Sequence, residues 1–297
     1  MRKSLWIILA LAIMLTACVS TGTQPPDSAE PTPTVGGQET PAPSPIPTPT
    51  PTPTPTPIPE PTPEPPPEPT LKPPRWAAED PFNAELVFEP AEDGVRYAFL
   101  TFDDGPSVNT PMLLELLDEL DVPATFFLLG SQVLKYPEYV LDIAEAGHTI
   151  ANHGYSHIYS GIYASEGAFH EDLKKSAAIL EDLLGDMFNS RLIRFPGGGS
   201  RYGGRHQNMK QRIEKNLGEH GLVSIDWNVT NGDGEIRSPT PKDCVEFFNN
   251  TLGRLSSNSH ALILMHDNGS SNTSTFDTLP EVVEKLREMG FILKALK

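Results

Sequence analysis

The stretch YAFLTFDDGP, residues 97–106, ends an apolar run with two adjacent aspartates and a Gly-Pro pair. Successive side chains of a β-strand point to opposite faces, so two aspartates inside a strand would direct one carboxylate into a core. At a strand end, a turn favoured by Gly-Pro can bring both carboxylates into one cleft. Carboxylates with different neighbours could then divide two roles, metal binding and proton transfer.

Apolar stretches of strand length recur along the chain, and stretches with helical periodicity separate most of them. The predicted strands are residues 97–102, 124–129, 149–152, 192–195, 222–227, 261–266 and 291–293. The predicted helices are residues 110–120, 137–146, 166–184, 207–220, 241–255 and 276–289. This alternation predicts an α/β fold with a parallel sheet covered by helices, which a barrel or an open sheet would satisfy.

Polar residues gather where the predicted strands end. They are Asp103, Asp104, His153, Arg194, Asp226 and His266. In parallel α/β architectures the carboxyl edge of the strands is where ligands bind and chemistry occurs. This placement favours the barrel and locates a candidate site at that edge.

The pentapeptide HGYSH contains two histidines four residues apart, His153 and His157. One helical turn would place both imidazoles on the same face. Such a pair by itself more often belongs to a solvated face or a capping turn than to a metal site. Two histidines with one carboxylate and an open position form the ligand set of a catalytic zinc site, and Asp104 is the natural third ligand.

Five motifs occur in a fixed order between residue 97 and residue 297. They are TFDDGP at 101–106, HGYSH at 153–157, RFPG at 194–197, DWNVTNGD at 226–233 and LMH at 264–266. This series resembles that of the polysaccharide deacetylases with NodB homology. The resemblance implies a deformed (β/α) barrel and the metal-dependent removal of acetyl groups from polysaccharides. The metal in that family is usually zinc, and Co²⁺ or Ni²⁺ sometimes serves.

The resemblance also implies a role for each matching residue. Asp104, His153 and His157 match the metal ligands. Asp103 matches the general base, Arg194 the arginine that pairs with that base, and His266 the general acid. A backbone N–H near Gly197 would stabilise the oxyanion that forms when water attacks the acetyl group.

Two motifs depart from the family pattern. Many relatives carry an aromatic residue after the proline of the third motif, whereas this chain has glycines at 197–199, which we expect to open the wall of the groove. In the altered fourth motif, Asp233 is the first candidate to orient His266 and Asp226 is the second.

The candidate substrate contacts are Gly197, Trp227 and Leu264. An aromatic face suits the C–H face of a pyranose, so Trp227 could stack on a sugar, although a core indole is the simpler and preferred interpretation.

Residues 1–18 resemble a bacterial lipoprotein signal, because an apolar run after Arg2 and Lys3 ends in LTAC at residues 15–18. A lipid is then expected on Cys18; an ordinary cleaved signal or an uncleaved anchor are the alternatives. Between Pro25 and Pro74 lie 22 of the 32 prolines, which predicts a disordered spacer over residues 19–85. The deacetylase-like domain would then occupy residues 86–297, outside the cytoplasm and anchored to the membrane by the lipid.

The formal net charge of −17 argues against nucleic acid as a partner. With Cys18 carrying a lipid, only Cys244 remains, so no intramolecular disulfide is expected. We expect the protein to be a monomer. The segments LMHDNGS, RFPGGGS and DWN resemble peptidoglycan deacetylases of Gram-positive bacteria more than plant-polymer esterases.

We therefore expect the substrate to be N-acetylglucosamine in a cell-envelope polysaccharide, peptidoglycan first. Chitooligosaccharide and acetylxylan are the alternative substrates. An inactive glycan-binding domain of the same fold and an amidase acting on a non-sugar amide are the alternative functions.

Overall fold

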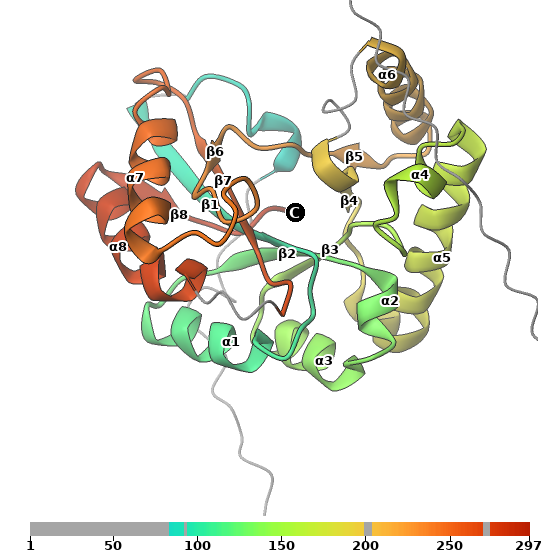
Figure 1. Cartoon of the computed structure of the whole chain (residues 1–297), viewed down its shortest axis with the longest axis horizontal. Coiled ribbons are helices and arrows are strands. Elements are labelled where there is room, and N and C mark those ends of the chain that lie inside the picture. Colours follow the sequence, from blue (N-terminus) through green and yellow to red (C-terminus); the bar gives the residue numbers. More distant parts are fainter. Residues whose placement is uncertain (1–82, 92–93, 199–203, 270–273) are drawn as a thin grey trace, which may run out of the picture. The chain divides into compact units, whose positions relative to one another are not determined.

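The computed structural model describes residues 83–91, 94–198, 204–269 and 274–297 (Figure 1). The predicted lipoprotein signal with Cys18, and all of the predicted spacer up to residue 82, lie outside the described residues. The first described element is the 3₁₀ helix η2 (Ala84–Leu86). Ala84 is buried, and its N–H donates to the carbonyl of Lys297, so the described fold includes residues assigned by sequence to the end of the spacer.

The central element is strand β1 (Arg96–Asp103), which pairs in parallel with β2 (Ala124–Leu128) and β7 (Ala261–His266). The other strands are β3 (Thr149–Asn152), β4 (Leu192–Ile193), β5 (Val223–Ser224), β6 (Val229–Thr230) and β8 (Phe291–Leu293). The strand order is β5-β4-β3-β2-β1-β7-β6, and β8 pairs with the first half of β1. The sheet curls into a half-barrel with helices around its outside (Figure 1), which confirms the predicted deformed barrel.

The helices follow the strands in the order that the periodicity predicts. They are α1 (Thr110–Glu119), α2 (Gly130–Val133), α3 (Pro137–Glu145), α4 (Tyr159–Ile162), α5 (Glu166–Leu184), α6 (Gly204–Glu219), α7 (Pro241–Leu252) and α8 (Ser274–Glu288), with 3₁₀ turns η4 (Gly185–Met187) and η5 (Pro196–Gly198). Helices α2 and α4 were not predicted, because a single turn is too short to show a period. Strand β6 was not predicted either, and β4 and β5 were predicted too long, because these strands have only two residues each.

Both faces of the sheet are buried, which explains why the strands read as continuous apolar runs. On β1 the residues Ala98, Leu100 and Phe102 pack in the cluster under the outer helices, whereas Phe99 packs in a second cluster inside the barrel. Strand alternation therefore directs Thr101 and Asp103 to the same inner face as Phe99. Cys244 is fully buried in α7, as expected for a small apolar side chain.

Among the residues that the structure describes, no helix combines the length and the apolar character that crossing a membrane requires.

Truncation of a core side chain should test this packing. Leu117 of α1 is fully buried in the outer cluster, so Leu117→Ala should lower the free energy of unfolding by about 2–5 kcal/mol. Leu134→Ala is the matched control, because Leu134 is 59% exposed and its truncation should change stability by about 0.5 kcal/mol or less. Urea unfolding followed by circular dichroism measures both, and equal effects would contradict the assignment of α1 to the core.

Candidate active site

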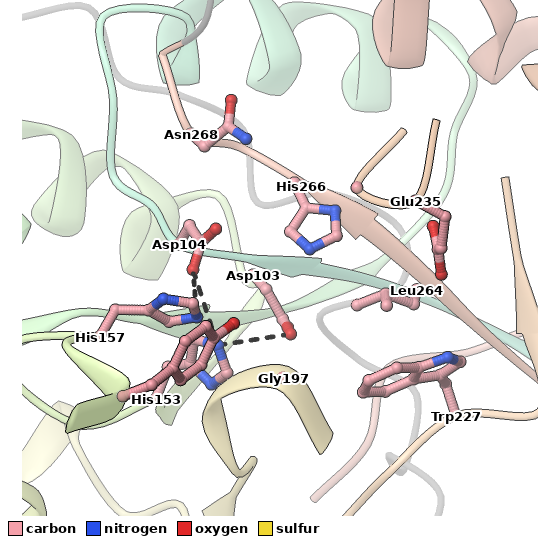
Figure 2. Close-up of a pocket in the computed structure, with 12 residues that line it drawn as sticks. Asp103, Asp104, His153, His157, Gly197, Trp227, Glu235, Leu264, His266 and Asn268 are labelled. Atoms are coloured by element: carbon pink, nitrogen blue, oxygen red, sulfur yellow. Dashed lines mark ion pairs between the residues drawn. The ribbon is translucent and has the colours of Figure 1, made fainter. Parts of the chain in front are cut away.

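A pocket of about 400 Å³ opens at the carboxyl ends of the strands (Figure 2). It is lined by Asp103, Asp104, His153, His157, Tyr159, Gly197, Trp227, Gly234, Glu235, Leu264, His266 and Asn268. Eight of the residues predicted for the site line this pocket. The remaining two, Arg194 and Asp233, lie behind it and contact lining residues.

The two aspartates separate because the backbone turns between them. Asp103 is the last residue of β1, and Asp104 adopts a left-handed conformation with φ of 72°. The following turn is tied to the end of β7 by Asp267, whose carboxylate accepts hydrogen bonds from Ser107 Oγ and Thr110 Oγ1, each at 2.5 Å. A Cβ at position 105 would lie 2.9 Å from Asp267 Oδ2, so this close approach requires Gly105.

Asp103 is paired with a fully buried arginine. Arg194 Nη1 donates to Asp103 Oδ1 at 2.8 Å and to Thr101 Oγ1 at 2.7 Å. Burial by itself would raise the pKa of Asp103, but the charges of Arg194, His153 and His266 outweigh it and lower that pKa. Asp103 is therefore ionised at neutral pH and held in one orientation.

Asp104 and the two histidines form a cluster suited to a metal ion. Asp104 Oδ1 lies 3.6 Å from His153 Nε2 and 3.4 Å from His157 Nε2. Around a tetrahedral zinc ion, ligand atoms at about 2.0–2.1 Å from the metal are about 3.4 Å from one another. Asp104 Oδ1 is also buried with no hydrogen-bond partner among the described residues, which is a costly arrangement that a cation would relieve. The donor set and its spacing therefore fit a divalent metal.

The protonation of His153 suits this role. Its Nδ1 lies 2.9 Å from the carbonyl oxygen of Arg194, which can only accept, so Nδ1 carries the hydrogen. In the neutral ring Nε2 then presents a lone pair toward Asp104. Burial lowers the pKa of His153 despite the nearby carboxylates, which favours the neutral ring that binds metal.

The prediction that one helical turn aligns the two histidines is wrong. Residues 153–157 form a loop in which Gly154 and His157 have φ of 82° and 56°, values that no helical turn contains. Asp172 of α5 holds this loop, accepting hydrogen bonds from Tyr155 N at 2.6 Å and Ser156 Oγ at 2.7 Å. Asp172 was not predicted to have this role. In the sequence it belongs to the polar face of a helix, and only the fold brings it beside the loop.

Asp233 holds His266 on the opposite side of the pocket. Asp233 Oδ1 lies 2.6 Å from His266 Nδ1, and Asp233 Oδ2 accepts from His266 N at 2.8 Å and from Thr275 Oγ1. Burial would lower the pKa of His266, but the Asp233 carboxylate, with smaller effects from Asp104 and Asp103, raises it to about 10. The imidazolium form, which can donate a proton, therefore persists at neutral pH.

Asp226, the second candidate for orienting His266, points elsewhere. Its Oδ2 pairs with Lys210 Nζ of α6 at 2.5 Å, and the same ammonium donates to the carbonyl of Gly198 at 2.9 Å. Through Lys210, Asp226 thus connects the pocket wall to α6, and Asp233 is the carboxylate that is hydrogen-bonded to His266.

Gly197 and Gly198 do not leave the wall open, contrary to our expectation, and Gly199 lies outside the described residues. A Cβ at Gly197 would lie 3.0 Å from Tyr159 Oη, and one at Gly198 would lie 2.9 Å from Trp227 Cη2. Both glycines have positive φ. The two aromatic rings thus occupy the space beside the glycine backbone, and Trp227 is a half-buried part of the pocket wall.

Sequence analysis missed four lining residues, namely Tyr159, Gly234, Glu235 and Asn268. Each lies one or two residues after the end of a quoted motif. Residues that border the motifs could therefore have been taken as candidates. A Cβ at Gly234 would lie 2.5 Å from His266 Cε1, which explains why a glycine follows Asp233.

Comparison with known proteins agrees with this geometry. A family model described as polysaccharide deacetylase matches residues 91–219. A peptidoglycan-N-acetylglucosamine deacetylase of Bacillus cereus is 26% identical over 201 residues, which cover 67% of this chain and 69% of the relative.

Two solved structures share the fold. The catalytic domain of a peptidoglycan N-acetylglucosamine deacetylase from Eubacterium rectale is 30% identical with a TM-score of 0.58, and the match covers 70% of this chain and 91% of that domain. A CE4 esterase from Streptococcus mutans is 29% identical with a TM-score of 0.65, covering 73% and 92% of the two chains.

The family match contains the aspartate pair, the histidine loop and Arg194, and the fold brings His266 from beyond that match into the same pocket. The chain therefore belongs to the polysaccharide deacetylase family.

Proposed function

We propose that this protein is a metal-dependent hydrolase that removes acetyl groups from N-acetylglucosamine units of a cell-envelope polysaccharide, with peptidoglycan as the leading substrate. One observation carries the proposal. Asp104 Oδ1, which has no hydrogen-bond partner among the described residues, faces two histidine Nε2 atoms beside the Arg194-paired carboxylate of Asp103. The names of the Bacillus cereus and Eubacterium rectale relatives support the choice of polymer.

Asp104, His153 and His157 would hold the divalent cation, with Zn²⁺ as the first candidate and Co²⁺ or Ni²⁺ as alternatives. When bound there, such a cation supplies Lewis-acid chemistry, polarising an acetyl carbonyl and acidifying water. The protein supplies the remaining groups from the other loops of the pocket.

Asp103 would act as the general base. Its carboxylate is ionised at neutral pH, and Arg194 holds it toward the pocket, where Oδ2 lies 3.6 Å from His153 Nε2. A water molecule attacking an acetyl carbon beside the histidines would be within reach of this carboxylate. Asp103 then removes the proton of that water as the new carbon–oxygen bond forms.

His266 would act as the general acid. Its Nδ1 is occupied by Asp233, so the proton on Nε2 is the one available to the departing sugar nitrogen. Transfer of that proton breaks the carbon–nitrogen bond and leaves acetate and a free amine. The backbone near Gly197 would donate to the oxyanion, and Trp227 with Leu264 would contact the sugar.

We further propose that the protein works outside the cytoplasm as a monomer, held at the membrane by a lipid on Cys18. The motif at residues 15–18 and the proline-rich segment that follows support this proposal. Metabolic labelling with a fatty acid, compared between the wild type and Cys18→Ala, would test the anchor.

Replacement of the base should abolish turnover without emptying the metal site. Asp103→Asn should lower kcat for acetate release from peptidoglycan or chitin oligomers by about 10²–10⁴-fold, because the amide cannot accept the proton. Metal content measured by mass spectrometry should stay near that of the wild type. Asp118→Asn, at an exposed position on α1, is the matched control, and near-normal activity of Asp103→Asn would refute the base assignment.

Removal of the metal should stop the reaction reversibly. Dialysis against a chelator should abolish acetate release, and added Zn²⁺ should restore it. His157→Ala should reduce the bound metal as well as activity, whereas His220→Ala, at an exposed histidine directly after α6 and outside the pocket, should change neither. Full activity in the chelated protein would exclude the proposed chemistry.

The pH profile should depend on Asp233. In the wild type the raised pKa of His266 keeps the acid protonated until pH rises toward about 10, above which activity falls. Asp233→Asn removes the charge that opposes burial, so the alkaline limb of kcat/KM should move by at least about one pH unit toward acid. Asp226→Asn should leave that limb in place; a shift in this variant instead would assign the orienting role to Asp226.

A further inference from the structure

A second pocket carboxylate, Glu235, has no part in the steps above. It lines the same pocket as Trp227, Leu264 and His266. In Figure 2 it lies on the side of His266 away from Asp104 and His157, with its carboxylate near Leu264 and Trp227. Glu235 therefore borders the part of the pocket where the sugar, and not the acetyl group, would lie.

The backbone around Glu235 is held in a defined turn. Glu235 N donates to the carbonyl of Gly232 at 3.2 Å, and Gly232 N donates to Thr230 Oγ1 at 3.1 Å. Gly232 has φ of 79°, and a Cβ there would lie 2.7 Å from Phe247 Cγ, so the turn packs closely on α7. This order reduces the entropy cost of presenting the Glu235 side chain to a ligand.

The Glu235 carboxylate has spare hydrogen-bonding capacity. Thr230 Oγ1 donates to Oε2 at 3.3 Å, whereas a carboxylate can accept about four hydrogen bonds. Among the described contacts, the His266 ring is hydrogen-bonded to Asp233 and not to Glu235. The remaining acceptor sites of Glu235 therefore suit a hydroxyl donor in the pocket better than a role in moving the His266 proton.

Trp227 provides a surface beside this acceptor. Its indole lies against Gly198, and the Arg194 guanidinium carbon is 5.7 Å from the ring centroid, so the ring is supported from behind. An aromatic face can cover the C–H face of a pyranose, and a carboxylate can accept from the hydroxyls at its edge. Trp227 thus suits the C–H face of a sugar ring, and Glu235 suits the hydroxyl groups at the edge of that ring.

We propose that Glu235 is a specificity-determining residue whose carboxylate accepts a hydrogen bond from a hydroxyl group of the sugar ring lying against Trp227. This proposal rests on the proposed function, because it assumes that a glycan occupies the pocket. It adds that the chain favours glycan-borne acetyl groups over the acetyl groups of small esters, which lack that hydroxyl.

Paired substrates test the proposal. Glu235→Ala should lower kcat/KM for a chitin oligomer by about tenfold or more, mainly through KM, because a hydrogen bond to a charged group is lost. Its kcat/KM for 4-nitrophenyl acetate should fall by about threefold at most. Glu235→Gln keeps an acceptor oxygen and the side-chain shape, so its loss on the oligomer should be smaller. Glu246→Ala, at an exposed carboxylate of α7 outside the pocket, is the matched control.

Three results would overturn the proposal. They are an unchanged kcat/KM for the oligomer in Glu235→Ala, an equal fold-loss on both substrates, and a shifted alkaline limb in Glu235→Gln, which would show that Glu235 acts through His266. Calorimetric binding of the oligomer to Asp103→Asn, with and without Glu235→Gln, gives a readout independent of turnover, and the second change should weaken binding. Absence of glycan deacetylation in the wild type would instead refute the proposed function, and this inference with it.

Discussion

The buried ion pair between Arg194 and Asp103 organises the side of the pocket that carries the proposed base and the candidate metal ligands. Arg194 is fully buried, and its guanidinium carbon lies 4.0 Å from the centroid of the Phe127 ring. Besides Asp103 and Thr101, it donates to the carbonyls of Ile225 and Asp226, which leaves little of its hydrogen-bonding capacity unused. A buried charge without such partners would cost several kcal/mol, so these contacts fix β1, β4 and the segment after β5 in one arrangement.

The same residue connects the base to the metal cluster. The backbone carbonyl of Arg194 accepts from His153 Nδ1, while its side chain holds Asp103. A shift of β4 would therefore disturb the base and a candidate metal ligand together. His266 is supported independently by Asp233 on the far side of the pocket, so the two ends of the site are built from separate hydrogen-bond networks.

Glycines with positive φ let these networks approach closely. A side chain at Gly154 would meet Asp172, which holds the histidine loop, and one at Gly198 would meet Trp227. The sequence motifs include these glycines, but we expected residues 197 and 198 to leave the wall of the groove open. A glycine in a sequence shows that space or backbone freedom is needed; only the folded chain shows which neighbour fills that space.

The strand and helix alternation and the family resemblance follow from the sequence alone, as do ten candidate site residues, of which eight line the pocket. These features depend on local periodicity and on motifs of adjacent residues. The sequence did not determine the loop geometry of His153 and His157, the support from Asp172, or the pocket positions of Tyr159 and Glu235. Those features depend on contacts between segments far apart in the chain. Some of these segments lie beside two-residue strands, which are too short to show a periodic pattern in the sequence. The sequence left Asp233 and Asp226 as alternatives. The folded chain distinguishes them, because Asp233 is hydrogen-bonded to His266 whereas Asp226 pairs with Lys210.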